Sequence, residues 1–560
     1  MRREDAVASL AGEAFDVAVI GGGITGAGVA LDAASRGYSV ALIERSDFGS
    51  GTSSKSSKLV HGGLRYLQNF DLGLVREALL ERQLMVRLSP HLVRPLPIVI
   101  PAFDGARPDR VTGIGLNMYD VMSTRSFRPR RPRRPAGGEG DLDAPAEEVD
   151  WSPDRHRVIS AEEVLERLPA LSTRNPSGGY LFYDCQTDDV RLVLTVLAEA
   201  GRFGTVAANR VEALALDREG ILARDVESGD EFVLRAANVI NATGVWADRI
   251  RPGELASEAE VPQIRPSRGT HILLDHADLP LVSGAIVPAG EGRTIFALPW
   301  YGMSLIGTTD NNYASELDHI QPAPEDVSYL LDAVNTFFAR TLTPADVAGA
   351  FAGVRPLIAS GDSRKSVDIS RKAELYETSS GMITITGGKL TTWRRMAKLA
   401  VDAVVERDGR YAPCRTDRIP LGQPVPAERL ERVPGVAEAA YAHLAARYGE
   451  RATRVLRLAA ERRELAKPIL AGYPDLLAEV AYAASEEQAR SVGDVLLRRT
   501  RLGLLAGRVL ARTAAPEPAR VADVLGAALG WDRLAIATAI QAFAAEATAE
   551  GIALPGGTPG

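Results

Sequence analysis

Cysteine is scarce in this sequence of 560 residues, which contains only Cys185 and Cys414. The two lie far apart and form no CxxC pair, so the sequence supports neither a disulfide framework nor a clustered thiolate metal site. It also lacks the cysteines that an iron–sulfur cluster or a c-type haem requires. We therefore expect a reducing compartment, no metal site, and an external acceptor for any electrons that the protein takes up.

Long apolar runs and an excess of basic residues are absent as well. No stretch approaches the roughly 18 to 20 apolar residues of a membrane span, and residues 1–15 carry acids where a signal peptide needs an apolar region. Lys and Arg number 65 against 72 Asp and Glu, and the resulting net charge of −7 excludes a protein that coats nucleic acid as a whole. We expect a cytoplasmic protein, and attachment to the inner face of the cell membrane stays open.

A strand, a glycine turn and a helix follow one another near the start of the chain. The apolar run 15–20 precedes Gly21-x-Gly23-x-x-Gly26, and a second apolar strand ends at Glu44. The first glycine of such a fingerprint permits a tight turn, the second lets the backbone approach a pyrophosphate, and the third lets the helix pack on the sheet. A carboxylate at Glu44 is placed to accept hydrogen bonds from an adenosine ribose, so we predict a dinucleotide site.

Two later segments favour a flavin over a nicotinamide, although both bind through this fingerprint. Ala242, Thr243 and Gly244 put small residues at the end of an apolar strand, where backbone passes close to a dinucleotide. Residues 387–392 begin a helix whose dipole and N–H groups can stabilise negative charge on a reduced flavin ring. Their joint order along the chain predicts FAD.

The remaining sequence divides into recognisable blocks. Residues 125–150 combine proline with like charges and are predicted to be a flexible insertion. The block 176–375 contains strands without long intervening helices, which predicts an antiparallel sheet, and the chain after Pro420 has helical periodicity. At roughly 150 residues per domain the length predicts three to four units. We expect an FAD-dependent oxidoreductase region at 12–410 and an all-helical domain at 415–547. FAD-binding segments are expected at about 12–100, 180–250 and 350–410, with substrate segments interleaved.

Several motifs resemble those of the FAD-dependent, aerobic-type glycerol-3-phosphate dehydrogenases, over roughly residues 12 to 545. The segments HGGLRYL at 61–67 and GGKLTT at 387–392 are specific to that family and to the related glycerophosphate oxidases. The resemblance implies a mixed α/β and α+β fold with an FAD-binding Rossmann-like domain of the D-amino-acid-oxidase and glutathione-reductase type. The fold that it implies also includes an antiparallel-sheet substrate domain and a C-terminal helical domain. The other matching motifs are the glycine fingerprint and residues 53–60, 183–185, 188–191, 306–310, 353–356 and 497–500.

The resemblance also implies which residues contact FAD. They come from the glycine fingerprint, the end of the second strand, the SSKSSKLVHGG segment, the strand ending at Ala242 and the GGKLTT turn. The predicted cofactor-binding residues are Gly21, Gly23, Thr25, Gly26, Glu44, Arg45, Thr52, Ser53, Ser54, Lys58, Leu59, His61, Gly62, Gly63, Ala242, Thr243, Gly244, Gly353, Gly388, Lys389, Leu390 and Thr391.

A glycerol 3-phosphate site needs several donors for the phosphate dianion, and arginine supplies the strongest. Arg65, Arg355, Arg371 and Lys389 lie in or beside the matching motifs, and Tyr66 adds a hydroxyl donor or a wall over the carbon chain. For Arg371, whose surroundings are least distinctive, a solvated surface charge is the equal alternative.

The implied reaction transfers hydride from C2 of the substrate to flavin N5, while a base takes the proton of the C2 hydroxyl. Histidine suits that step near neutral pH. We predict His271 as the base and His61 as an active-site group near the flavin, although the sequence does not exclude the reverse. Lys389 is expected to balance charge on the reduced flavin and the product carbonyl. The predicted catalytic residues are therefore His271, His61, Lys389 and Arg355.

The electron acceptor implied by the resemblance is a membrane quinone, with oxygen as the oxidase alternative. Reaching a quinone would require peripheral attachment through an amphipathic face near residues 72–88 or contact of Arg125–Arg134 with anionic lipid. A solvated insertion is the favoured interpretation of the arginine run. A homodimer stays possible.

Two rival functions fit parts of the sequence. An amine or amino-acid oxidase of the same fold would need less positive charge than Arg65, Arg355 and Lys389 provide. An FAD-containing nucleic-acid-binding protein would use the arginine run and the helical tail, but the run lacks interleaved aromatics. If this second rival were correct, the affinity for nucleic acid would fall steeply as the salt concentration rises.

Overall fold

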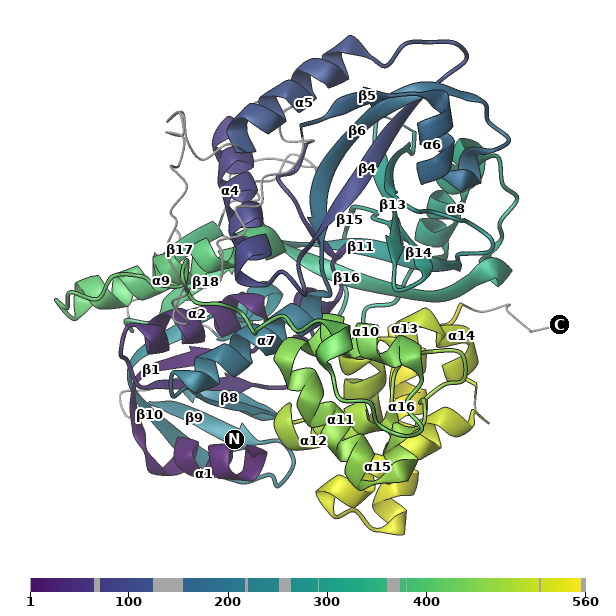
Figure 1. Cartoon of the computed structure of the whole chain (residues 1–560). Helices are drawn as coiled ribbons and strands as arrows, with labels where there is room; N and C mark the ends of the chain where they lie inside the picture. Colours follow the sequence, from purple (N-terminus) through teal and green to yellow (C-terminus); the bar gives the residue numbers. More distant parts are fainter. Residues whose placement is uncertain are drawn as a thin grey trace, which may run out of the picture.

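The computed structural model describes residues 2–64, 71–123, 155–216, 220–250, 263–290, 292–359, 373–378, 380–512 and 515–554. Two sheets and a group of C-terminal helices make up the chain (Figure 1). Within the described residues no helix has both the length and the apolar character that crossing a membrane requires.

The first sheet, sheet A, has the strand order β17-β18-β10-β1-β2-β7. In addition, β9 pairs with β10, and β8 pairs with β9. Pairing is parallel from β18 through β10, β1 and β2 to β7, and antiparallel elsewhere. The strands are β1 (Ala14–Ile20), β2 (Val40–Glu44), β7 (Val206–Asn209), β8 (Val211–Leu216), β9 (Ile221–Asp225), β10 (Glu231–Asn241), β17 (Ala373–Glu377) and β18 (Ile383–Gly387).

Three helices cover one face of sheet A: α2 (Ile24–Ser35), α7 (Asp189–Arg202) and α9 (Trp393–Arg407). Parallel strands are buried on both faces, which explains why β1 and β2 are almost continuously apolar. Gly28 lets α2 pack closely on α9, because a Cβ there would lie 2.5 Å from the Trp393 ring. Helix α1 (Arg3–Gly12) packs against the opposite side.

The second sheet, sheet B, has the order β15-β11-β14-β13-β12-β4-β6-β3, with β16 added beside β11 and β5 beside β6. Its pairs are antiparallel except for β12 with β4, which is parallel. The strands are β3 (Leu59–Val60), β4 (Arg94–Phe103), β5 (Arg157–Ile159), β6 (Pro176–Gln186), β11 (Gln263–Asp275), β12 (Gly284–Pro288), β13 (Thr294–Trp300), β14 (Met303–Gly307), β15 (Asn311–Asn312) and β16 (Val347–Ala359). The antiparallel sheet predicted for residues 176–375 is confirmed for β6 and β11 to β16, apart from that one pair. It is wrong for β7 and β10 of the same block, which pair in parallel within sheet A.

Helices cover both faces of sheet B. Helices α4 (Leu72–Leu88) and α5 (Arg110–Ser123) pack on one face, and α6 (Ala161–Arg167) and α8 (Pro324–Phe338) on the other. The proposed membrane face at 72–88 is wrong, because Val75, Leu79 and Met85 of α4 are buried in the protein cores. The predicted insertion at 125–150 and the Arg125–Arg134 run lie outside the described residues.

The C-terminal region is helical, as expected, and shares its hydrophobic core with sheet B. In Figure 1 its green and yellow helices lie beside sheet A and below sheet B. The helices are α10 (Glu438–Tyr448), α11 (Ala452–Glu461), α12 (Leu477–Glu486), the π-helical turn η11 (Asp494–Arg499), α13 (Leu502–Leu505), α14 (Gly507–Leu510), α15 (Pro516–Leu529) and α16 (Arg533–Glu550).

Candidate functional site

A cavity of about 1220 Å³ lies where the carboxyl ends of the parallel strands of sheet A meet sheet B and the C-terminal helices. Ile20, Glu44 and Gly387, each at the end of a strand, all line it. Val354 contributes from β16 and Ala545 from α16. Ligands of open α/β sheets bind at this edge, where loops from several strands converge.

The first glycine turn has the geometry of a phosphate cradle. Gly21 has φ of +109°, and a Cβ there would lie 2.8 Å from the carbonyl oxygen of Ala242. At Gly26 a Cβ would lie 1.9 Å from the Gly21 carbonyl oxygen, so this glycine permits close packing of α2 on the turn. Gly23 provides no capping side chain, and the first turn of α2 holds no acidic residue. The N-terminus of α2 therefore suits an anionic diphosphate.

Glu44 is held in place by two backbone N–H groups. Its Oε2 accepts from Gly22 N at 2.7 Å and its Oε1 accepts from Ser46 N at 2.8 Å. Burial raises the pKa of the Glu44 carboxyl, and these two hydrogen bonds oppose that rise by stabilising the charged form. Each carboxylate oxygen keeps a further lone pair, so Glu44 can still accept from the two hydroxyls of a ribose.

The second glycine turn faces the same cavity. Gly387 and Gly388 have φ of +76° and +65°, and they lead directly into the turn η7 (Leu390–Thr392) and helix α9. A Cβ at Gly388 would lie 2.3 Å from the sulfur of Met396. Lys389 lines the cavity beside these glycines, so the helix end and a cation approach the ligand together.

The cavity gathers most of the predicted cofactor residues. Those that line it are Gly21, Gly23, Thr25, Glu44, Arg45, Thr52, Ser53, Ala242, Thr243, Gly244, Gly388, Lys389 and Leu390. Those that do not line it are Gly26, Ser54, Lys58, Leu59, His61, Gly62, Gly63, Gly353 and Thr391. The residues that line the cavity include both glycine turns and Glu44. The volume of the cavity exceeds that of a typical drug-sized site. These residues fit a dinucleotide such as FAD.

Lys58 is committed to other partners. Its side chain is fully buried, and Nζ donates to Asp189 Oδ2 at 2.7 Å and to the Ser54 carbonyl oxygen at 2.5 Å. Asp189 also binds Arg501 of the C-terminal region. Burial lowers the pKa of the Lys58 ammonium to about 8, against the opposing effect of Asp189. Lys58 therefore belongs to a buried charge cluster and lies off the cavity lining.

One face of sheet B carries the predicted catalytic side chains. A Cβ at Gly269 would meet the Arg355 guanidinium at 2.4 Å, and one at Gly307 would meet the His271 ring at 2.2 Å. Gly269 and His271 are two positions apart on β11, so a Cβ at Gly269 would project to the same side as the His271 side chain, and the Arg355 guanidinium lies on that side too. The His61 ring meets Phe296 edge-on, at 6.2 Å between centroids. Because Phe296 is paired with Gly307, His61 joins this face.

His271 is 2% exposed and stacks on Phe351, with 4.8 Å between ring centroids. Its Nε2 lies 2.9 Å from the hydroxyl of Ser57. Burial lowers the pKa of His271 well below its usual value, and the positive charges of Lys58 and Arg355 lower it further. His271 is therefore a neutral imidazole at physiological pH, the form that can accept a proton.

Arg355 does not line the cavity, although its neighbours in β16, Val354 and Pro356, do. Its Nη2 donates to Thr308 Oγ1 at 2.9 Å and to the Thr309 carbonyl oxygen at 3.1 Å. These bonds fix the guanidinium beside His271, whose pKa it affects.

His61 is tied to the second glycine turn. Its backbone N–H donates to Thr391 Oγ1 at 3.1 Å. The structure thus brings His271, Arg355 and His61 onto one face of sheet B, and His61 also contacts the turn that carries Lys389. Of these four residues, only Lys389 lines the cavity. The predicted substrate residues Arg65, Tyr66 and Arg371 lie outside the described residues.

The sequence patterns missed a large part of the cavity wall. Arg210 and Trp246 line it from sheet A and the turn that follows β10, and His319 lines it from a loop after β15. Arg498 and Glu546 come from the C-terminal helices. Trp246 lies two residues after Gly244 and was within reach of motif analysis, whereas Arg210 and Glu546 stand in no recognisable motif.

Comparison with known proteins agrees with this geometry. The family model for FAD dependent oxidoreductases matches residues 16–403, and the model for the C-terminal domain of alpha-glycerophosphate oxidase matches residues 382–535. The chain is 36% identical over 555 residues to glycerol-3-phosphate dehydrogenase 2 of Mycobacterium tuberculosis, covering 96% of this chain and 89% of that protein. Aerobic glycerol-3-phosphate dehydrogenase of Bacillus subtilis is 34% identical, with 89% of each chain covered.

A solved structure of glycerol-3-phosphate dehydrogenase from Bacillus halodurans, complexed with FAD, aligns with a TM-score of 0.75 and 27% identity. The alignment covers 99% of this chain and 98% of that one. Fold and cavity together therefore define a flavin-dependent oxidoreductase, with FAD as its cofactor. More narrowly, the chain belongs to the FAD-dependent glycerol-3-phosphate dehydrogenase family. The predicted fold class, family and cofactor are confirmed.

Proposed function

We propose that this protein oxidises sn-glycerol 3-phosphate to dihydroxyacetone phosphate and passes the electrons to a quinone. The observation that carries the proposal is the face of sheet B beside the FAD cavity, where neutral His271 and cationic Arg355 lie together. The names of the relatives support the substrate, since those proteins are glycerol-3-phosphate dehydrogenases.

His271 is the base in this proposal. It takes the proton of the C2 hydroxyl as C2 becomes a carbonyl carbon, and its low pKa keeps the imidazole free to do so. When bound, FAD supplies the acceptor for the hydride that leaves C2. The Phe351 ring and the Ser57 hydroxyl orient the imidazole, which lowers the entropy cost of aligning it with the substrate.

Arg355 binds the phosphate. Thr308 and the Thr309 carbonyl hold part of its fork, so the guanidinium is oriented before substrate arrives. A chain with a net charge of −7 needs such a local cation to admit a dianion. Lys389 adds a second cation at the flavin side, and His61 contributes to the wall beside it. Arg65, Tyr66 and Arg371 stay predicted parts of the same site.

The test is an anaerobic titration of the FAD-loaded protein. Glycerol 3-phosphate should bleach the flavin band near its visible maximum, whereas glycerol and amino acids should not. The glycerol arm isolates the phosphate requirement, and the amino-acid arm tests the rival oxidase. A flavin that stays oxidised with saturating glycerol 3-phosphate contradicts the substrate assignment.

The acceptor is tested by reoxidation of the substrate-reduced protein. We expect a soluble quinone analogue to restore the flavin band much faster than dissolved oxygen does. Faster reoxidation by oxygen would make the protein a glycerophosphate oxidase, the activity for which its C-terminal family model is named.

Access to a membrane quinone requires peripheral attachment, for which α5 offers an apolar stripe. Val111, Ile114, Met118 and Val121 are exposed at helical spacing, with Arg107 and Arg110 exposed before them. An amphipathic helix of this kind inserts its apolar face into the headgroup region. Co-sedimentation with anionic vesicles should fall when Val111 and Ile114 are replaced by Ser, and unchanged sedimentation would remove α5 from the proposal.

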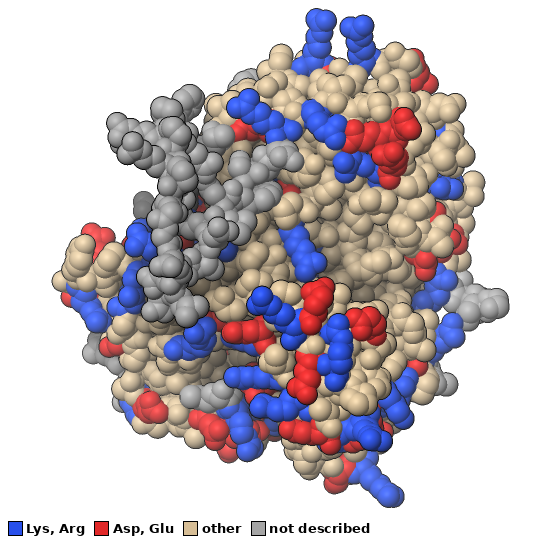
Figure 2. Space-filling view, in the orientation of Figure 1, with Lys and Arg blue, Asp and Glu red and all other residues tan. Residues whose placement is uncertain are grey.

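The nucleic-acid rival receives no support from the face shown in Figure 2. Basic and acidic side chains are interspersed over the C-terminal helices there, among the described residues. Gel-shift titration at two salt concentrations separates the two functions, since electrostatic nucleic-acid binding weakens steeply with salt.

A further inference from the structure

The C-terminal region supplies part of the wall of the FAD cavity. Ser491, Asp494 and Arg498 line it from η11 and the loop before it, and α16 lines it with one side of its last three turns. The α16 residues at the cavity are Ala542, Ala545, Glu546, Ala549 and Glu550. The same cavity holds Glu44, the carboxylate that marks the adenosine end of a dinucleotide site, and Arg210 lines the cavity as well.

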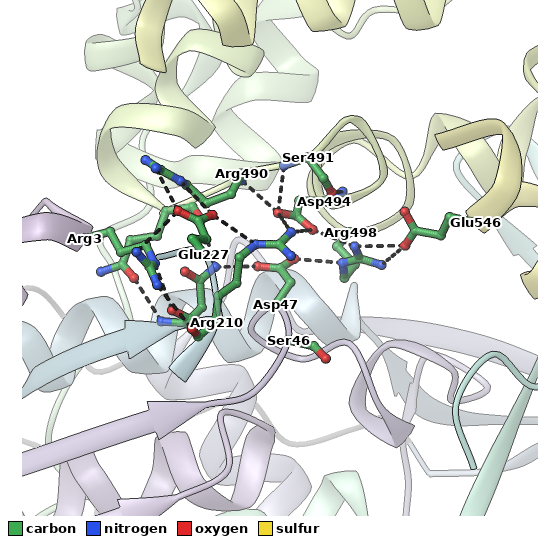
Figure 3. Close-up of polar contacts among 12 residues, drawn as sticks. Arg3, Ser46, Asp47, Arg210, Glu227, Arg490, Ser491, Asp494, Arg498 and Glu546 are labelled. Atoms are coloured by element: carbon green, nitrogen blue, oxygen red, sulfur yellow. Dashed lines mark hydrogen bonds and ion pairs between the residues drawn. The ribbon is translucent and has the colours of Figure 1, made fainter. Parts of the chain in front are cut away.

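Arg498 links this wall to the loop that follows Glu44 at the end of β2 (Figure 3). Its Nε donates to Asp47 Oδ2 at 2.7 Å, and its Nη2 donates to Asp494 Oδ1 at 2.7 Å. Both Nη atoms also reach Glu546 Oε1, at 3.1 and 3.2 Å. One guanidinium therefore joins the loop after β2, the η11 turn and helix α16.

Asp47 is the anchor on the side of sheet A. It is 1% exposed, and Arg499 binds its two oxygens at 2.7 and 2.8 Å in a bidentate pair. Asp47 lies three residues after Glu44, and Ser46 between them donates its N–H to the Glu44 carboxylate. The position of Glu44, the carboxylate predicted to bind ribose, therefore depends on Arg498 and Arg499, because both bind Asp47 three residues further along the chain.

The end of the strand next to β2 is tied to the same turn and to the loop after β2, where the Arg210 backbone N–H donates to the Ser46 carbonyl oxygen at 2.9 Å. Arg210, between β7 and β8, donates to both oxygens of Asp494 at 3.1 and 2.9 Å. Glu546 approaches the turn closely because residue 493 is glycine, where a Cβ would lie 1.8 Å from Glu546 Oε2. Asp47 and Asp494 are almost fully buried, so removing their arginine partners would leave uncompensated buried charges.

We propose that the C-terminal helical region forms the outer wall of the adenosine end of the FAD site. In this proposal Ala545 faces the cofactor directly. Arg498 is a positioning residue that couples docking of the helical region to retention of FAD. The proposal concerns cofactor binding alone, so it stands or falls independently of the substrate and the acceptor.

The wall is tested with a matched pair of substitutions on α16. Ala545 lines the cavity and its neighbour Ala544 is exposed without lining it. Ala545→Trp and Ala544→Trp add the same volume to the same exposed helix. The readouts are the Kd for FAD, from quenching of its fluorescence as the full-length apoprotein is titrated, and the unfolding midpoint of the apoprotein. We expect Ala545→Trp to raise the Kd at least about tenfold and Ala544→Trp to leave it unchanged, with similar apoprotein midpoints.

Arg498 is tested with Arg498→Met and the conservative Arg498→Lys. The control is Arg454→Met, which removes an exposed ion pair with Glu486 in the same region. We expect Arg498→Met to raise the Kd for FAD about tenfold, the equivalent of one lost hydrogen bond. Arg498→Lys should recover part of the affinity by renewing the contact with Asp47, while Arg454→Met keeps the affinity of the unmodified protein.

Each arm has a result that overturns the proposal. Equal FAD affinity in Ala545→Trp and Ala544→Trp would show that α16 is not a wall of the cofactor site. Affinity in Arg498→Met equal to that of Arg454→Met would remove Arg498 as a positioning residue. If Arg498→Met does not fold, the Lys variant and the α16 pair still decide the question.

Discussion

Removal of the Glu44 carboxylate tests the cofactor site most quantitatively. Each Glu44 oxygen already accepts one backbone N–H, and each has capacity for one ribose hydroxyl. Hydrogen bonds to a charged group contribute about 1.5–3 kcal/mol each, so losing two of them costs FAD binding about 3 kcal/mol or more. Glu44→Ala should therefore raise the Kd for FAD at least about a hundredfold. Glu44→Gln, which keeps one acceptor but turns an amide toward a backbone N–H, should raise it about tenfold.

The assay is titration of the apoprotein with FAD, followed by fluorescence quenching, with Glu231→Gln on the exposed end of β10 as the control. The pH dependence gives an independent check. Burial raises the pKa of Glu44 above its usual 4.5, and ribose donors favour the charged carboxylate. FAD affinity should then fall as the pH drops through this raised value, and Glu44→Gln should flatten the dependence. Unchanged affinity in Glu44→Ala would refute the ribose contact.

Four further predictions concern the residues of the site and its wall. His271→Asn should slow flavin reduction by glycerol 3-phosphate in single turnover about a hundredfold or more with little change in substrate affinity, and an unchanged rate would exclude it as the base. In the unmodified protein that rate should stay flat as the pH falls through 6.5, because burial and the nearby cations lower the pKa of His271. Arg355→Lys should raise the KM more than it lowers kcat, since a single ammonium cannot replace the fork; an equal loss in both would point to a different role. His319→Gln tests the contact with Glu550, which raises the pKa of His319 and helps to lower that of Glu550 to about 2. The stabilisation from protonated His319 should be complete below pH 6.5 and disappear as the pH rises through its raised pKa, so thermal unfolding of His319→Gln should lack that step.

Local patterns were enough to predict the parts of the site that are local in sequence. The turn from Gly21 to Gly26 and the carboxylate of Glu44 belong to one βαβ unit of about thirty residues, whose geometry is set by steric rules on glycine and by strand pairing. The Gly387–Gly388 turn has the same character. The structure places Gly21, Gly23, Glu44, Gly387 and Gly388 at one cavity, as the order of the motifs indicated.

The remaining parts depend on contacts between distant segments. Arg498 forms an ion pair with Asp47, which lies near the other end of the sequence. Nothing in the helical periodicity around Arg498 indicates this contact with the loop after β2. Lys58 shows the converse, because its motif suggested a cofactor contact whereas its charge is neutralised by Asp189 in the interior. Amphipathic periodicity in α4 could not distinguish a membrane face from a face buried between two protein cores.

The central claim is that both glycine turns contact one flavin and leave a cationic site beside it. A crystal structure of the FAD-loaded protein with dihydroxyacetone phosphate tests this most directly. We predict the flavin ring between the Lys389 turn and the face that carries His271, with the phosphate within hydrogen-bond distance of Arg355. Density for the phosphate on another surface, or a flavin ring remote from Lys389 and Arg355, would contradict the account.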